Sequence, residues 1–172
     1  MSRIAEPSIY FSLIQRMLNN GAINLPKNYH DMFKLRKGKN GELLGWEIIN
    51  KRVFFYNNDF LKVDEKAKSK KALGEYLIEK HTYHFNPHED NDLERFRIDK
   101  KRSEPLHAND ERNGNNLHLS PEQLKLDINN FNLYLAIHLS LLYISKRKYP
   151  LDDKYGNEYN AELIKHRREC NG

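Results

Sequence analysis

Apolar and polar residues alternate in four short segments between positions 81 and 120. Successive side chains of a β-strand point to opposite faces of a sheet, so this alternation predicts four half-buried strands. If the strands pair in chain order, their apolar positions share one face: Tyr83, Phe85, Phe96, Ile98, Leu106, Ala108, Leu117 and Leu119. The other face, called the polar face below, carries His84, Arg95, Arg97, Asp99, His107, Asn109 and His118.

The chain before these segments predicts a helix and then a strand meander. Residues 7–19 carry an apolar stripe at helical spacing, and Pro7 suits a first helical turn. The pair Asn40-Gly41 predicts a tight turn between strands. Trp46 falls in the meander, and we expect it in the core. The strands expected here span residues 32–36, 43–49 and 52–56.

Residues 63–80 are interpreted as a second helix that begins at Asp64 as its N-cap. Gly74 is unfavourable in a helix interior and weakens the middle of this segment. Its early part is basic, so it forms either a solvated helix face or a face that contacts phosphates. The lysines concerned are Lys66, Lys68, Lys70 and Lys71.

A strong helix start follows the fourth segment. Ser120 can cap a helix, Pro121 fits its first position, and Gln123 completes a capping box. The apolar residues from 124 to 144 predict a long helix at the buried centre of the domain, with a break near Asp127. His138 lies on this helix and is expected to be a core residue rather than a ligand.

These elements predict an α+β fold, an antiparallel sheet of about six or seven strands with helices packed on its apolar face. Residues 1–145 are expected to form one domain: residues 1–80 supply the N-terminal helix, meander and second helix, and residues 81–145 the histidine-bearing sheet and apolar helix. Residues 146–172 form a basic tail with a short helix at 159–169.

Charge and cysteine content indicate the kind of partner and the cellular compartment. The net charge of +5 over 172 residues favours a polyanionic partner such as nucleic acid, although ordinary solubility charge would look the same. Cys170 is the only cysteine, so no disulfide forms within the chain, which suits a reducing cytoplasm. No apolar run reaches the ~18 residues of a membrane span, and the N-terminus lacks a signal-peptide core. We therefore expect a cytoplasmic protein.

The polar face is the one place with enough chemistry to support an activity. The sequence has no P-loop, no GxGxxG loop, no GxSxG elbow and no cysteine–histidine zinc pattern. Metal-independent RNA cleavage needs a base for the 2′-hydroxyl, an acid for the leaving 5′-oxygen and cations for the phosphate. Histidine and arginine supply these roles near neutral pH.

In this hypothesis His107 and His118 are the acid–base pair and His84 is a third participant. Asp99 orients an imidazole, as carboxylates do in catalytic triads. The residues expected to bind substrate are Arg95, Arg97, Asn109, Lys101 and Arg102. No cofactor or metal is required.

Two other interpretations of the polar face stay open. His84, His107 and His118 could together bind zinc, since three imidazoles suffice for a catalytic zinc site. The two nearby arginines argue against this, because they would repel a dication. The histidines could also be polar residues on a solvated sheet face with no function.

The order of motifs YHF, RFRID, PLHAND and NLHLSPEQL, followed by an apolar helix, resembles the TumE-like toxins of bacterial toxin–antitoxin pairs. The resemblance covers residues 81–145 and rests on Arg97, Asp99, His107 and His118. It implies a small basic ribonuclease with an Arg–Tyr–Asp-like strand. The chain has Ile98 where that family favours tyrosine, and it lacks the doubled histidine that follows the strand.

The leading functional hypothesis is therefore a metal-independent ribonuclease of the toxin type. The alternative is a non-catalytic accessory factor of a phage or defence system that binds nucleic acid or protein. The expected partners are RNA, an antitoxin or other protein, and a second copy of the chain in a homo-oligomer, with no membrane association.

Overall fold

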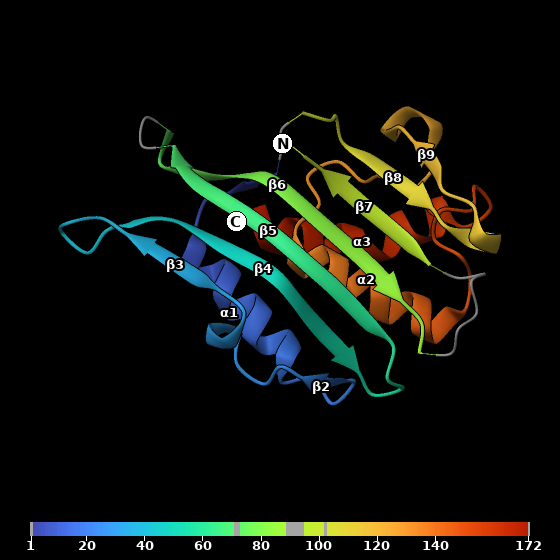
Figure 1. The fold of residues 1–172 in the computed structure, drawn as a ribbon, viewed down its shortest axis with the longest axis horizontal. Coiled ribbons are helices and arrows are strands. Elements are labelled where there is room, and N and C mark those ends of the chain that lie inside the picture. The colour runs from blue at the N-terminus through green and yellow to red at the C-terminus, as the bar shows by residue number, and fades with distance from the viewer. Residues whose placement is uncertain (1, 71–72, 89–94, 102, 172) are drawn as a thin grey trace.

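A computed structural model of the protein describes residues 2–70, 73–88, 95–101 and 103–171. Within them, nine antiparallel strands form one sheet, and three α-helices lie together behind it in the view of Figure 1. The expected α+β fold is confirmed. The strands are β1 (Arg3–Ile4), β2 (Ile23–Leu25), β3 (Lys34–Lys37), β4 (Leu43–Phe55), β5 (Phe60–Lys70), β6 (Glu75–Asn86), β7 (Phe96–Lys100), β8 (His107–Asp110) and β9 (Leu117–Leu119). The helices are α1 (Pro7–Leu18), α2 (Leu133–Lys146) and α3 (Gly156–Asn171).

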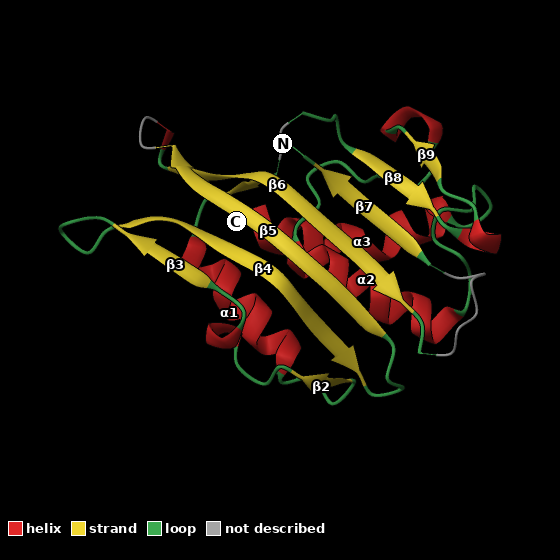
Figure 2. Cartoon of the chain, viewed as in Figure 1, coloured by secondary structure: helices red, strands yellow, loops and turns green. Residues whose placement is uncertain are grey.

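The sheet runs in the order β2-β4-β5-β6-β7-β8-β9, with β1 beside β6 and β3 beside β4. Figure 2 shows the resulting two layers, with the helices covering one face of the long central strands. Alternating burial follows from this arrangement. In β5, for example, Leu61, Val63 and Ala67 are buried under the helices, while Lys62 and Lys66 are only half-buried. The face away from the helices is called the open face below.

The helix predicted for residues 63–80 is wrong. The described residues of this range belong to the hairpin of β5 and β6, which pair from Phe60 opposite Asn86 to Lys70 opposite Glu75. The buried positions recur every second residue, which is strand periodicity, and the lysines point to the open face. Gly74 has a φ of +65° in the connection between the strands, a conformation that glycine adopts without strain. Lys71 lies outside the described residues.

The other predicted elements of the first half are confirmed with shifted ends. The N-terminal helix is α1, and Trp46 is fully buried. The strands expected at 43–49 and 52–56 form the single strand β4, whose pairing with β5 shifts register between Ile48 and Lys51. Asn50 has a φ of +49° at this irregularity. The sequence predicts a break between two strands here, and the structure has a bulge within one continuous strand.

The long apolar helix begins later than predicted. Pro121–Gln123 form one 3₁₀ turn that includes the expected capping box, and the α-helix α2 starts only at Leu133. Asn132 caps it through a bond from the Leu135 backbone N–H. The tail helix is α3, which packs against α2 and buries Tyr159 and Leu163 in the same core. None of the described helices is long and apolar enough to cross a membrane.

Gly45 in β4 provides a test of the sheet packing. It has a φ of +149°, and an added Cβ would overlap the backbone carbonyl oxygen of Ala67 in β5. We expect Gly45→Ala to lower the free energy of unfolding by about 2–4 kcal/mol in urea denaturation, because the clashing atom belongs to the backbone. Gly21→Ala is the matched control, since its Cβ meets nothing within 4 Å. Equal losses in both variants would contradict this explanation.

Candidate active site

The pairing of β6 to β9 brings most of the polar face together. His84 lies opposite Arg97, Arg97 opposite Asn109, and Asn109 opposite His118, so these side chains form one row across four strands. Asp99 lies opposite His107 in the next row. The apolar residues of the same strands mostly face the helices, as the alternation predicts. Leu117 is the exception at the end of the sheet, with 57% of its surface exposed.

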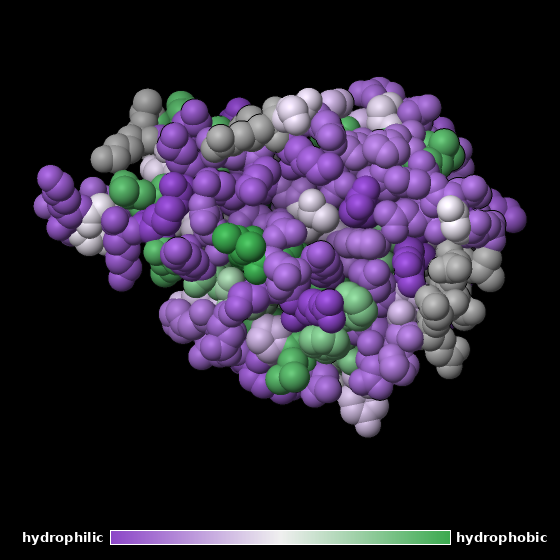
Figure 3. Space-filling view, in the orientation of Figure 1, coloured by the Kyte–Doolittle hydropathy of each residue, from purple (hydrophilic) through white to green (hydrophobic). Residues whose placement is uncertain are grey.

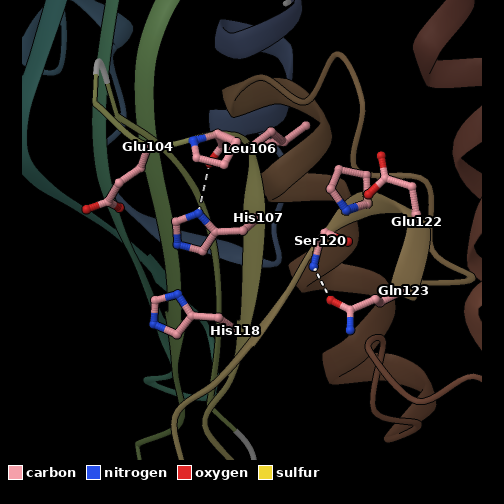
Figure 4. Close-up of a pocket in the computed structure, with 9 residues that line it drawn as sticks. Glu104, Leu106, His107, His118, Ser120, Glu122 and Gln123 are labelled. Carbon is pink, nitrogen blue, oxygen red and sulfur yellow. Dashed lines mark hydrogen bonds between the residues drawn. The ribbon is translucent and has the colours of Figure 1, made fainter.

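His107 and His118 are in direct contact. Their rings stack with centroids 4.9 Å apart and planes 13° from parallel. Nδ1 of His107 lies 2.9 Å from the carbonyl oxygen of Pro105. A carbonyl only accepts, so Nδ1 donates its proton there, and Nε2 is the nitrogen that gains or loses a proton. Figure 4 shows the two rings side by side and this bond as a dashed line.

The histidine pair lines an open pocket of about 630 Å³. The 3₁₀ turn at Pro121–Gln123 also lines this pocket, and its capping box holds it in place through a 2.9 Å bond from the Ser120 N–H to Gln123. In Figure 4 the two imidazole rings point away from this turn. Pro105 and Leu106 add apolar surface. The pocket is large enough for part of a nucleotide, and both histidines are among its lining residues.

Asp99 lies at the centre of the site and is 1% exposed. Its Oδ2 lies 2.7 Å from Nε of Arg97, 3.1 Å from the Asn109 amide nitrogen and 3.8 Å from Nε2 of His107. The carboxylate thus faces the side chains of three neighbouring residues at once. Asp99 therefore lies beside the His107 imidazole but faces Nε2, whereas the carboxylate of a catalytic triad bonds to Nδ1.

Several buried polar atoms in the site have no hydrogen-bond partner among the described residues, among them Oδ1 of Asp99, Nε2 of His107 and Oδ1 of Asn109. Most buried polar atoms in folded proteins are paired, so this cluster retains hydrogen-bonding capacity for another molecule. The same burial limits access. Nε2 of His107 is enclosed, whereas the side chain of His118 on the edge strand β9 is exposed.

Sequence reasoning missed Glu111. Its carboxylate lies 2.9 Å from Nε2 of His84 and 3.7 Å from Nη1 of Arg97. The bond from His84 is the main cause that holds the pKa of Glu111 below its usual range. Arg97 thus lies between two carboxylates, which reduces the positive charge it can offer to a phosphate. Glu111 directly follows β8, and that position at a strand end was the one available signal.

The remaining predicted site residues lie further away. His84 is separated from His118 by β7 and β8, about 14 Å at three strand spacings of ~4.8 Å. The side chain of Lys101 is exposed and pairs with Glu104 at 3.3 Å. Arg95 is half-buried, and its backbone carbonyl accepts a 2.7 Å bond from the Tyr149 hydroxyl. Arg102 lies outside the described residues.

A zinc site built from three histidines does not fit this geometry. His84 is too far from His118 for both to bind one ion, since zinc–nitrogen bonds are about 2.0–2.1 Å long. Among the described residues, no group of three histidine, cysteine, aspartate or glutamate side chains is arranged to hold a metal.

In comparisons with protein-family models, curated proteins and solved structures, the chain matches none of them. The resemblance to TumE-like toxins therefore stays a hypothesis that rests on the motifs alone. Any function has to be argued from the site itself.

Proposed function

We propose that the protein is a metal-independent ribonuclease of the toxin type, which a partner protein neutralises. The observation that carries the proposal is the stacked pair of His107 and His118, which line a pocket. Asp99 faces Nε2 of His107. Two imidazoles in contact can hold one proton and accept another near neutral pH, which is the requirement for acid–base cleavage of RNA.

The roles follow from accessibility and charge. His118 is the base: it takes the proton of a 2′-hydroxyl as that oxygen attacks the phosphorus. His107 is the acid, and its Nε2, which lies 3.8 Å from Oδ2 of Asp99, supplies the proton. The bond from phosphorus to the 5′-oxygen breaks, and that oxygen takes the His107 proton. The products are a 2′,3′-cyclic phosphate and a free 5′-hydroxyl.

Access to His107 requires a movement. Its Nε2 is enclosed, and the ring of His118 stacks against it. His118 lies on the short edge strand β9, whose only strand partner in the described sheet is β8. A change of its side-chain rotamer on substrate binding would expose Nε2, and catalytic hydrogen bonds often form only in the substrate complex.

The direct test is an RNA cleavage assay with the purified protein in buffer that contains EDTA. We expect cleavage without added metal and less than stoichiometric zinc by elemental analysis, because no three ligands converge among the described residues and Arg97 would repel a dication. One bound zinc per chain that is lost in His118→Ala would overturn the mechanism.

Expression in cells provides an independent test of the toxin type. The wild-type chain is expected to arrest growth, and His107→Ala is expected to relieve the arrest. Arrest that persists in this variant would argue against a role for the histidine pair.

A second candidate function is RNA binding without cleavage. Two observations favour it: the enclosed Nε2 of His107, and the position of Arg97 between Asp99 and Glu111. Both reduce the groups available for catalysis, while the cations Arg52 and Lys62 elsewhere on the same sheet face stay available for phosphates. The histidine variants described in the Discussion separate the two functions.

A further inference from the structure

The row of polar side chains at the site continues across the open face. Arg52 in β4 lies opposite Lys62 in β5, and Lys62 lies opposite His84 in β6. The row then runs through Arg97 and Asn109 to His118. It crosses six strands, which is about 24 Å at five spacings of ~4.8 Å.

This row is positively charged at the end away from the histidine pair. Neither Arg52 nor Lys62 makes an ion pair with a described residue. The neighbouring Lys80, opposite Lys66 in the sheet, makes none either, whereas Lys66 pairs with Glu47 at 2.6 Å. Unpaired basic side chains on one surface provide the charge complementarity that a phosphate backbone requires.

Two aromatic rings adjoin the basic row. Phe54 and Phe60 lie directly opposite each other on the open face, with ring centroids 5.7 Å apart. Both are only half-buried, although neighbouring Val53, Phe55 and Leu61 are fully enclosed. The guanidinium of Arg52 lies 4.9 Å from the Phe60 ring centre. Figure 3 shows this face as mostly hydrophilic with small apolar patches.

We propose that the open face binds single-stranded RNA, with phosphates on Arg52 and Lys62 and bases stacked on Phe54 and Phe60. The inference rests on the proposed function, because it assigns the substrate of the same site and directs the strand along the row to His118. Aromatic rings on a sheet surface can stack only on unpaired bases, since bases in a duplex are already stacked on each other. An acidic protein would match the charge but would give the two rings no comparable role.

The first test measures binding of a fluorescent oligouridine of about 12 nucleotides, a length within the site size of known single-strand binders. His118→Ala serves as the background, so that the RNA stays intact. Adding Arg52→Gln and Lys62→Gln should lower the slope of log affinity against log salt by about 1.4, because each single-strand phosphate contact contributes about 0.7. The matched control, Lys125→Gln with Lys165→Gln, removes the same charge beside α3 and should leave the slope unchanged.

The second test removes one ring. Phe60→Leu in the same background should weaken oligouridine binding about 5- to 150-fold, since stacking of one base on an aromatic side chain contributes ~1–3 kcal/mol. Binding of a duplex RNA should hardly change. Circular dichroism and thermal melting show whether the variant keeps its fold, and Phe54→Leu provides a second variant if it does not.

The outcomes distinguish this inference from the proposed function. If the basic and aromatic variants bind oligouridine as tightly as their background, or if duplex RNA binds equally well, the open face does not bind single strands. That result would leave cleavage by the histidine pair intact. If wild type never cuts RNA but the variants lose binding as described, the inference stands and the ribonuclease proposal fails.

Discussion

His118→Ala is expected to reduce RNA cleavage by ~10²–10⁴-fold, the usual contribution of one general acid or base. The side chain is exposed on the edge strand β9, so its removal should change the free energy of unfolding by no more than ~0.5 kcal/mol. Affinity for RNA should stay within a few-fold, because the phosphate contacts lie elsewhere in the row. Cleavage and filter binding are measured on the same preparations across neutral pH.

His107 requires a different substitution. It is 7% exposed and its ring fills the space between Pro105 and His118, so alanine would leave a cavity as well as remove the imidazole. His107→Gln retains bulk and a donor but cannot transfer a proton near neutral pH. We expect a loss of cleavage similar to that of His118→Ala, because each step of the reaction needs its own group.

His88→Ala is the matched control for both variants, since His88 follows the end of β6, has an exposed side chain and is not part of the row. It should cleave like wild type.

The alternative function, RNA binding without cleavage, predicts that wild type cuts no RNA in any buffer. If Asp99→Asn retains full cleavage, the proposed role of Asp99 in orienting His107 is wrong.

The polar face could be predicted because alternation is a local property of a strand. Once Phe96, Ile98 and Ala108 face the core, Arg97, Asp99 and Asn109 must face the other way. Because β7 and β8 pair in chain order, these three side chains lie next to one another on that face. What the sequence does not reveal is how deeply each side chain lies. Burial of Asp99 and Asn109 depends on neighbours in other strands, so the expectation of a solvated face was wrong for these positions.

The helix prediction for residues 63–80 is wrong for a related reason. Lysine and glutamate are good helix formers, and their local preference favours a helix. The β5–β6 hairpin instead pairs along its whole length and buries Val63, Ala67 and Ile78. Tertiary burial therefore outweighed local propensity. Contacts between distant parts of the chain, such as Tyr149 with Asp110 at 3.1 Å, have no local signal at all.

Glu65 is the clearest example of such a non-local feature. It is 1% exposed in β5 on the helix-facing side of the sheet. Its carboxylate accepts bonds from Trp46 Nε1 at 2.7 Å, the Tyr83 hydroxyl at 2.5 Å, the Tyr10 hydroxyl at 3.0 Å and the backbone N–H of Leu133 at 3.1 Å. One carboxylate therefore connects β4, β6, α1 and the start of α2.

Glu65→Ala is expected to lower the free energy of unfolding by about 2–6 kcal/mol. Two buried donors, the Trp46 N–H and the Tyr83 O–H, lose their acceptor, and each unpaired group costs ~1–3 kcal/mol. Urea denaturation at neutral pH measures the loss. Glu162→Ala on the exposed side of α3 removes the same charge and should stay within ~0.5 kcal/mol. A small effect at Glu65 would mean that water replaces the carboxylate.

The pH dependence of stability tests the charge state of Glu65. Burial raises the pKa of its carboxyl group, and the four hydrogen bonds oppose that shift without cancelling it. A folded-state pKa above the unfolded value of about 4.3 means that this group stabilises the fold most fully below that pH. The contribution is lost as the pH rises through the folded-state pKa. Glu65→Gln cannot ionise, so the stability of wild type relative to this variant should fall from about pH 4 upward. If wild type instead gains stability over Glu65→Gln across that range, the donors hold the carboxylate ionised and the direction of the shift is wrong.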